Sequence, residues 1–211
     1  GGFRAPAFLE LPCADAPSPC IGLQSGVAPD TSLGSLRPVR ARSLEAGVSA
    51  SPLDDLTLTA TAFRIDLHDD IFAVTLPSTT RVVFQNVGDT RRQGVEVKLR
   101  GAAGPFALEG SYAYTLATFE SDLSLATPRL SGPESVARGD ELPLNPRHRA
   151  ALGCRLRALS WFDLSAGVQY VGSQYYLGDE QNVAPKLDPY LVFQAGAEAR
   201  WRGWSAFVRA N

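Results

Sequence analysis

The sequence predicts an all-β fold, namely part of an antiparallel transmembrane β-barrel. Three observations lead to this prediction. Alternating segments of about ten residues recur along the chain, their connections switch strictly between short and long, and aromatic residues gather near both kinds of connection. Outer-membrane barrels combine these features, because tight turns occupy one rim, long loops occupy the other, and aromatic girdles mark both interfaces. A soluble β-sandwich has no reason to sort its connections in this way.

Eight segments show the alternation of apolar and polar residues that is typical of β-strands. These expected strands cover 43–50, 56–67, 95–100, 106–116, 149–159, 162–171, 191–201 and 204–211. One set of alternate positions is apolar, as at Leu44 and Val48, and the other carries most charges, as at Glu96 and Lys98. We expect the apolar set to face lipid and the charged set to face a water-filled or plugged lumen. On a soluble sandwich, the charged set would instead be the solvent-exposed face.

The connections and aromatic residues support the same orientation. Short connections lie near Ser51–Asp54, Gly101–Gly104, Leu159–Ser160 and Arg202–Gly203, and long ones span His68–Thr90, Thr118–Arg147 and Ser173–Pro189. The expected girdles are Trp161, Phe162, Trp201 and Trp204 at the short turns, and Tyr170, Tyr175, Tyr176 and Tyr190 at the long loops. Within 56–67 the apolar phase shifts from Leu58 to Phe63, and we expect a β-bulge near Ala62 to explain the shift.

Composition excludes other classes of protein. No apolar run approaches the ~20 residues that a transmembrane helix needs. The net charge of -2 gives no electrostatic basis for binding nucleic acid. The sequence has no phosphate-binding glycine loop, nucleophile motif or metal-ligand cysteine spacing, so it predicts no enzyme, no catalytic residues, no metal and no cofactor.

The expected strands form only part of a barrel. Residues 1–40 are proline-rich and are expected to form an extracellular loop-like segment, whereas residues 41–211 form the meander of strands. An open sheet edge in lipid costs several kcal/mol for each unpaired backbone group. We therefore expect further strands outside this chain, and the absence of Met and of a signal peptide agrees with a fragment.

The three cysteines divide into a pair and a single residue. Cys13 and Cys20 bracket a proline-rich hexapeptide, and this spacing allows a disulfide that would suit an oxidising cell-surface setting. Two free thiols are the alternative. Cys154 lies on the apolar side of its strand, where a cysteine behaves as a small hydrophobic residue.

Four motifs occur in order along the chain. They are Gly2-Phe3-Arg4-Ala5-Pro6 with Leu9-Glu10-Leu11, Leu36-Arg37-Pro38-Val39 with Ser43-Leu44-Glu45-Ala46-Gly47, Asn86-Val87-Gly88 with Gly94-Val95-Glu96, and Leu142-Pro143-Leu144-Asn145-Pro146-Arg147-His148. These motifs resemble those in the C-terminal part of the barrel of TonB-dependent outer-membrane receptors. The plug domain, the energy-coupling box and the final hairpin of that family are absent from this sequence.

The resemblance implies a fold, a location and a function. It implies a monomeric, plugged barrel of about twenty-two strands in the bacterial outer membrane. Such a receptor imports a scarce ligand, and a TonB-type energy-transducing complex drives it through the plug. The favoured ligand is an iron–siderophore complex, with vitamin B12, other metal chelates and glycans left open. A passive porin or an adhesin is the alternative function.

Four residues are candidates for ligand binding. Tyr175 and Tyr176 begin a long polar loop, and paired aromatic residues suit a ring-containing chelate. They could equally belong to the interfacial girdle. Arg147 and His148 could meet an anionic ligand at the loop base or form salt bridges at the rim. A barrel-embedded hydrolase would need a serine beside a histidine, and no such pairing is evident for His148 or His68.

Overall fold

The computed structural model describes residues 2–5, 36–75, 82–125 and 134–211. The strands are β1 (Gly2–Arg4), β2 (Val39–Leu53), β3 (Leu56–His68), β4 (Ile71–Thr75), β5 (Val82–Asn86), β6 (Thr90–Ala103), β7 (Phe106–Phe119), β8 (Leu123–Leu125), β9 (Glu134–Val136), β10 (His148–Leu159), β11 (Phe162–Val171), β12 (Tyr190–Trp201) and β13 (Trp204–Ala210). Nine form one antiparallel sheet, in the order β1-β2-β3-β6-β7-β10-β11-β12-β13, while β4 pairs with β5 and β8 with β9. Among these described residues, no helix is long and apolar enough to span a membrane.

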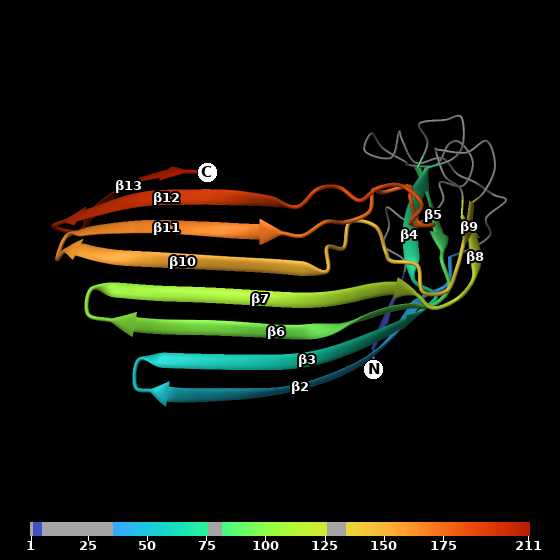
Figure 1. The fold of residues 1–211 in the computed structure, drawn as a ribbon, viewed down its shortest axis with the longest axis horizontal. Helices are drawn as coiled ribbons and strands as arrows, with labels where there is room; N and C mark the ends of the chain where they lie inside the picture. The colour runs from blue at the N-terminus through green and yellow to red at the C-terminus, as the bar shows by residue number, and fades with distance from the viewer. Residues whose placement is uncertain (1, 6–35, 76–81, 126–133) are drawn as a thin grey trace.

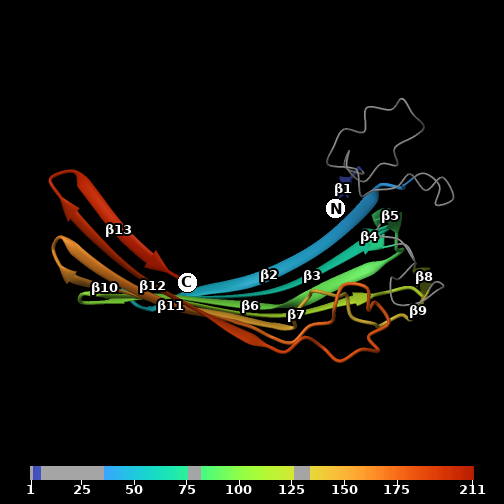
Figure 2. The same cartoon turned by 90° about the horizontal axis from the view of Figure 1, so that it is seen from above.

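The connections are sorted by length, as the sequence predicts. Figure 1 shows the tight turns at one end of the sheet and the two extra hairpins at the other. In Figure 2 the sheet bends into an open arc, with β2 and β13 rising on the same side. The arc is part of a barrel wall, which confirms the predicted fold class.

The eight long strands lie where the alternation places them. Residues 1–40 depart from the loop-like expectation at both ends, because β1 pairs with β2 and β2 already begins at Val39. Cys13 and Cys20 lie outside the described residues, so their predicted disulfide stays a prediction. Cys154 is a free thiol opposite Leu108 and Ala166, on the apolar side of the sheet.

The strand register gathers apolar side chains on one face. Val97 lies opposite Ala60 and Tyr112, and the next apolar row crosses several strands in the same way. Many of these side chains are exposed, including Leu44 at 73% and Phe193 at 65%. A continuous apolar face of this kind marks a surface that lies against lipid or another apolar partner. It is the lipid-facing side of the wall.

The predicted bulge near Ala62 is wrong. Pairing of β3 with β6 runs unbroken from Leu56 to Leu67, and the irregularity in its pairing with β2 lies beyond Ala50, at the turn. The apolar phase changes because the surroundings change. β3 has 13 residues and β6 has 14, more than the ~9–11 that cross a bilayer. The ends of these strands next to the long loops therefore project into water. There the outward-facing residues are polar and the inward-facing residues are apolar.

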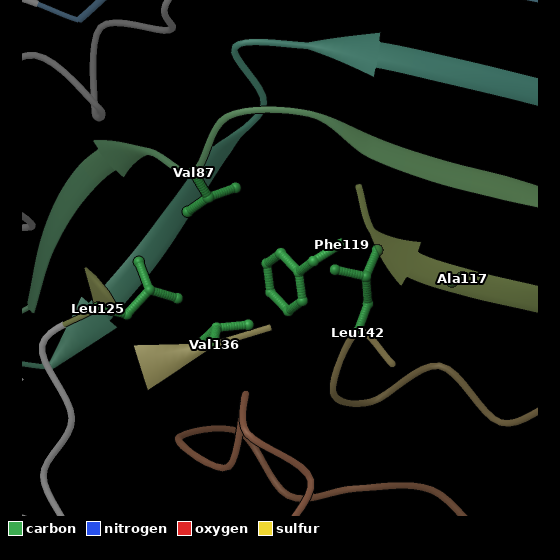
Figure 3. Packing of buried hydrophobic residues seen from close by; sticks show 6 residues of the cluster. All are labelled: Val87, Ala117, Phe119, Leu125, Val136 and Leu142. Atoms are coloured by element: carbon green, nitrogen blue, oxygen red, sulfur yellow. The ribbon is translucent and has the colours of Figure 1, made fainter. Parts of the chain in front are cut away.

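A compact core lies at the loop end of the sheet. Figure 3 shows its six residues, which come from β7, the β8–β9 hairpin and the connections that precede β6 and β10. They are Val87, Ala117, Phe119, Leu125, Val136 and Leu142. Phe72 packs against Phe119 with ring centroids 5.7 Å apart. This core joins the hairpins to the strand ends and gives the loops a fixed base.

Gly94 explains why the motif around β6 contains a glycine at this position. A Cβ atom on Gly94 would lie 1.9 Å from the backbone oxygen of Tyr114. Glycine therefore allows β6 and β7 to approach closely at the level where the strands leave the lipid.

Candidate functional site

The base of the two long C-terminal loops is organised around Glu141. Arg147 donates two hydrogen bonds of 2.9 Å to its carboxylate, from Nε and from a terminal guanidinium nitrogen. Lys186 Nζ donates a third, also of 2.9 Å. The Lys186 ammonium also lies 4.5 Å from the ring centroid of Tyr175. One carboxylate thus joins both loops and orients an aromatic ring beside a cation.

Asn182 clamps the two loops together through backbone contacts. Its side-chain oxygen accepts a hydrogen bond from the Glu141 amide, and its side-chain nitrogen donates to the Glu141 carbonyl at 2.9 Å. Asn182 has a φ of 59°, in the left-handed region that asparagine tolerates better than most residues. The Asp179 carboxylate closes the same turn by accepting from the amides of Val183 and Ala184.

A second set of contacts joins this loop to the β8–β9 hairpin. The Glu180 amide donates to Glu134 Oε1 at 3.2 Å, and Gln181 Nε2 donates to the Ser135 carbonyl at 2.7 Å. The segment before β10 is in turn fixed to the barrel wall, because the Leu142 amide donates to the Ala117 carbonyl at 2.9 Å. The loops therefore form a bonded cap on the rim.

The charges of the cluster stabilise each other. Burial alone would raise the pKa of Glu141, but the hydrogen bonds from Arg147 and Lys186 outweigh it and hold this pKa below its ordinary value. The same hydrogen bond to Glu141 raises the pKa of Arg147. Glu141 is therefore ionised at neutral pH and keeps both cations in place.

Three of the four predicted ligand-binding residues lie at this loop base. Arg147 and Tyr175 share the Glu141 cluster, and Arg147 forms a salt bridge at the rim, which is the predicted alternative to ligand binding. Tyr176 follows directly, is 48% exposed, and accepts a backbone hydrogen bond from Asp179. The loop base thus presents an exposed Tyr176 and a half-exposed Arg147 guanidinium to solvent.

His148 lies elsewhere, on the lipid-facing side. Its register partner is Tyr114 in β7, and Ala150, two residues further along β10 on the same face, lies opposite Tyr112. Its Nδ1 atom is 2.8 Å from the Tyr112 hydroxyl, and its ring centroid is 5.3 Å from that of Tyr114. With Tyr170, these residues form an aromatic belt where the strands leave the lipid. Tyr190, expected in that girdle, is opposite Val171 on the polar face instead.

The polar face of the sheet is hollowed. One groove of about 330 Å³ extends from β7 to β13, and its polar walls include Glu109, Arg155 and Arg209. A second, of about 350 Å³, lies beside it with Lys98, Arg100 and Gln169. These grooves open on the side opposite the lipid-facing rows. The charged positions thus line the concave, lumenal side that the sequence predicts.

Histidine, cysteine and acidic side chains do not gather into a metal site in the part of the chain that the structure describes. His68 contacts Asp89 at 3.0 Å, and its ring lies at the edge of the water-exposed strand ends. This arrangement is a solvent-exposed contact between two side chains at a loop edge.

Family membership follows from comparison with known proteins. The TonB-dependent receptor-like β-barrel family matches the chain over residues 1–211, so the chain belongs to this family. No curated protein matches the sequence. The family places the chain in the bacterial outer membrane, and its members are receptors rather than enzymes, in agreement with the prediction.

Solved structures of similar fold belong to receptors and a transporter. The ferric-catecholate import receptor Fiu from E. coli K12, in its closed form, is 24% identical, with a TM-score of 0.55 over 78% of this chain and 22% of that one. The copper transporter OprC is 18% identical, with a TM-score of 0.62 over 94% and 27%. BauA, the ferric preacinetobactin receptor from Acinetobacter baumannii, is 16% identical, with a TM-score of 0.56 over 88% and 26%. The chain thus spans about a quarter of the length of these proteins.

Proposed function

We propose that the receptor containing this chain imports a ferric siderophore across the outer membrane. The observation that carries the proposal is the bonded loop cap, which presents Tyr176 and half of Arg147 to solvent above the lumenal face. An exposed aromatic ring and a guanidinium on the same loop base suit an anionic, ring-containing chelate. Fiu and BauA, which share this fold, are described as ferric-chelate receptors.

The same proposal includes an energy source for import. A TonB-type inner-membrane complex would act through a plug domain contributed by another part of the receptor, which would function as a monomeric barrel. The polar grooves beside Glu109 and Arg155 offer hydrogen-bonding groups along the lumenal wall. A passive porin or an adhesin would need neither the energised complex nor a ligand-selective cap.

Uptake of siderophores labelled with radioactive iron tests both the proposed ligand and the proposed energy source. A deletion strain that carries the wild-type gene should accumulate the label, and an uncoupler should abolish the accumulation. Unchanged iron uptake and growth of the deletion strain under iron limitation would remove the siderophore hypothesis. Uptake that persists with the uncoupler would instead favour a passive pore. Vitamin B12 and other chelates serve as competing ligands in the same assay.

A pair of variants tests the loop cap itself. Tyr176→Ala should weaken ligand binding about tenfold, the usual effect of losing one well-placed contact. Val183→Ala is the matched control, because Val183 lies on the same loop, is 66% exposed and belongs to no part of the Glu141 cluster. Equal affinity of the two variants would exclude Tyr176 from the ligand site.

A further inference from the structure

The grooves of the lumenal face join into one trough. A third groove, of about 270 Å³, shares Lys98 and Gln169 with the second groove. The second groove shares Glu109 and Gly153 with the first. Along β10 the three grooves extend from Arg149 to Arg155, which is about 20 Å at the usual rise of a strand. The three joined grooves are called the lumenal trough below.

The lumenal trough is hollow because its floor carries small side chains. Gly153 lies directly opposite Gly167 in the register, and Ala151 lies opposite Ser111. A Cβ atom on Gly153 would meet no atom closer than 4.0 Å, so the space above this glycine is open. Longer polar side chains, such as that of Gln194, border the floor. The trough can therefore admit polar groups of a ligand.

The lumenal trough carries more positive than negative charge. Its lining has five basic side chains and two carboxylates, which leaves three positive charges in excess (5 − 2). The basic residues are Lys98, Arg100, Arg149, Arg155 and Arg209, and the acidic ones are Glu96 and Glu109. Each carboxylate already has a basic partner, at 3.6 Å for Glu96 and 3.8 Å for Glu109. In the described part of the chain, Arg149 and Arg155 form no ion pair.

The lumenal charges next to the trough, on the side of the short turns, are balanced. Arg157 is the next lumenal position of β10 after Arg155, and its Nε atom is 4.0 Å from the Asp163 carboxylate. Arg200 also pairs with Asp163 and, at 2.9 Å, with Glu198. Two basic side chains thus meet two carboxylates there. The positive excess belongs to the trough and not to the whole lumenal wall.

We propose that the lumenal trough is a second ligand site, which holds an anionic chelate on its way through the barrel and so favours anionic over neutral ligands. This inference rests on the proposed import function. Guanidinium groups bind anionic oxygen atoms strongly, and Arg149 and Arg155 have their donors available. The trough begins two residues from Arg147 of the loop cap, so a chelate that leaves the cap meets Arg149 first. A neutral chelate would gain nothing from the excess charge.

Two engineered cysteines in the full-length receptor test the charge and openness of the trough. Ser111→Cys places a thiol on the floor of the trough, and Ser49→Cys is the matched control. Both serines are exposed and share one lumenal row, because the register runs from Ser49 through Thr59 and Lys98 to Ser111. Each thiol is treated with methanethiosulfonate reagents of similar size that carry a sulfonate or a trimethylammonium group. Mass spectrometry of the labelled peptide gives the ratio of the anionic to the cationic rate, which cancels differences in thiol reactivity.

This ratio should be about fivefold higher at Ser111→Cys than at Ser49→Cys, because the positive excess attracts the sulfonate reagent. Adding Arg149→Gln and Arg155→Gln should remove most of that difference. Equal ratios at the two positions would overturn the proposal. Failure of both reagents to react at Ser111→Cys would also overturn it, since the plug or another segment would then fill the trough.

Uptake kinetics test the role of the trough in import. The probes are a trianionic ferric tricatecholate and a neutral ferric trihydroxamate. Arg155→Gln should lower the maximal rate of tricatecholate uptake about fivefold and leave its binding at the cell surface unchanged. Arg157→Gln is the matched control on the same face of β10, outside the trough, and should behave like the wild type. Any uptake of the trihydroxamate should be the same in all three receptors.

The two experiments separate failure of the trough from failure of the import function. If the wild type imports neither chelate, import of ferric siderophores is excluded, and the ratio of thiol rates still decides whether the trough attracts anions. If Arg155→Gln imports the tricatecholate as fast as Arg157→Gln, import stands and the second site is overturned. The heat-dependent electrophoretic shift of a folded barrel confirms that each variant compared is folded.

Discussion

The membrane-crossing part of the long strands and their loop end place apolar side chains on opposite faces of the sheet. Along the membrane-crossing part, apolar side chains such as Phe193 point outward and stay exposed. At the loop end, Ala117 and Phe119 of β7 point to the other side and are fully buried. Of the residues that the structure describes, the buried hydrophobic ones all lie at this loop end. The solvent that surrounds a strand, rather than the strand itself, decides which face is apolar.

The two parts also differ in what holds them together. The membrane-crossing part relies on the unbroken hydrogen-bond ladders of its antiparallel strands, which satisfy the backbone in lipid. The loop end relies on a small core and on the side-chain bonds of Glu141 and Asn182. Substitutions of the same type should therefore have different consequences in the two parts, and this difference can be measured.

The largest effect is expected from Phe119→Ala. Phe119 is 0% exposed, and removing a buried phenylalanine ring costs about 3–5 kcal/mol. We expect the hairpins β4–β5 and β8–β9 to lose their packing, so that proteases cleave the loops of the receptor in intact outer membranes. The control Val183→Ala changes an exposed loop residue and should shift stability by about 0.5 kcal/mol or less. Equal cleavage of both variants would mean that the loop end has no stabilising core.

A smaller effect is expected from Val97→Arg in the membrane-crossing part. An arginine on the lipid-facing side costs about 2–4 kcal/mol near the bilayer midplane. Ala113→Arg is the matched control, because Ala113 lies on the lumenal face of the neighbouring strand, opposite Glu96. Denaturant unfolding of the receptor in lipid vesicles gives the two free energies. A larger loss for Ala113→Arg than for Val97→Arg would reverse the assignment of the faces.

The comparison also explains which parts of the fold the sequence could predict. Period-two alternation locates the eight long strands, because each strand has one apolar face along its length in lipid. The change of apolar phase near Ala62 predicts a bulge wrongly. Alternation shows which side of a strand is apolar, but it does not show whether lipid or water surrounds that part of the strand. Arg64 and Asp66 mark the point where β3 enters water, and a change of solvent explains both phases without a break in pairing.

The loop base was only partly predictable for a different reason. Arg147 and Tyr175 stand out in the sequence by their type and position, and the structure brings both to one carboxylate. Glu141, Lys186 and Asn182 carry no local signal, since the contacts of Glu141 with the latter two span 45 and 41 residues. His148 was grouped with Arg147 because they are adjacent, but adjacent residues of a strand point to opposite faces.

The smallest effect is expected from acid, and it is confined to the loop end. Because the folded-state pKa of Glu141 lies below the ordinary 4.5, its ion pairs contribute stability above that pH and lose it as the pH falls through the folded value. The contribution is about 1 kcal/mol, since Arg147 is 44% exposed and solvent screens the pair. The protection factors of residues 173–189, which correct for the slower intrinsic exchange of amides in acid, should therefore fall on acidification, while those of the membrane-crossing strands should not.

Two variants isolate this response. Glu141→Gln should exchange faster at neutral pH and should show a smaller further change in acid, because it has no carboxylate to protonate there. Glu109→Gln removes a 73% exposed carboxylate from the lumenal face and should leave the acid response of the loops unchanged. If Glu141→Gln kept the full acid response, a group other than Glu141 would hold the loops on the rim. The loop end would then not owe its acid sensitivity to the ion pairs of Glu141.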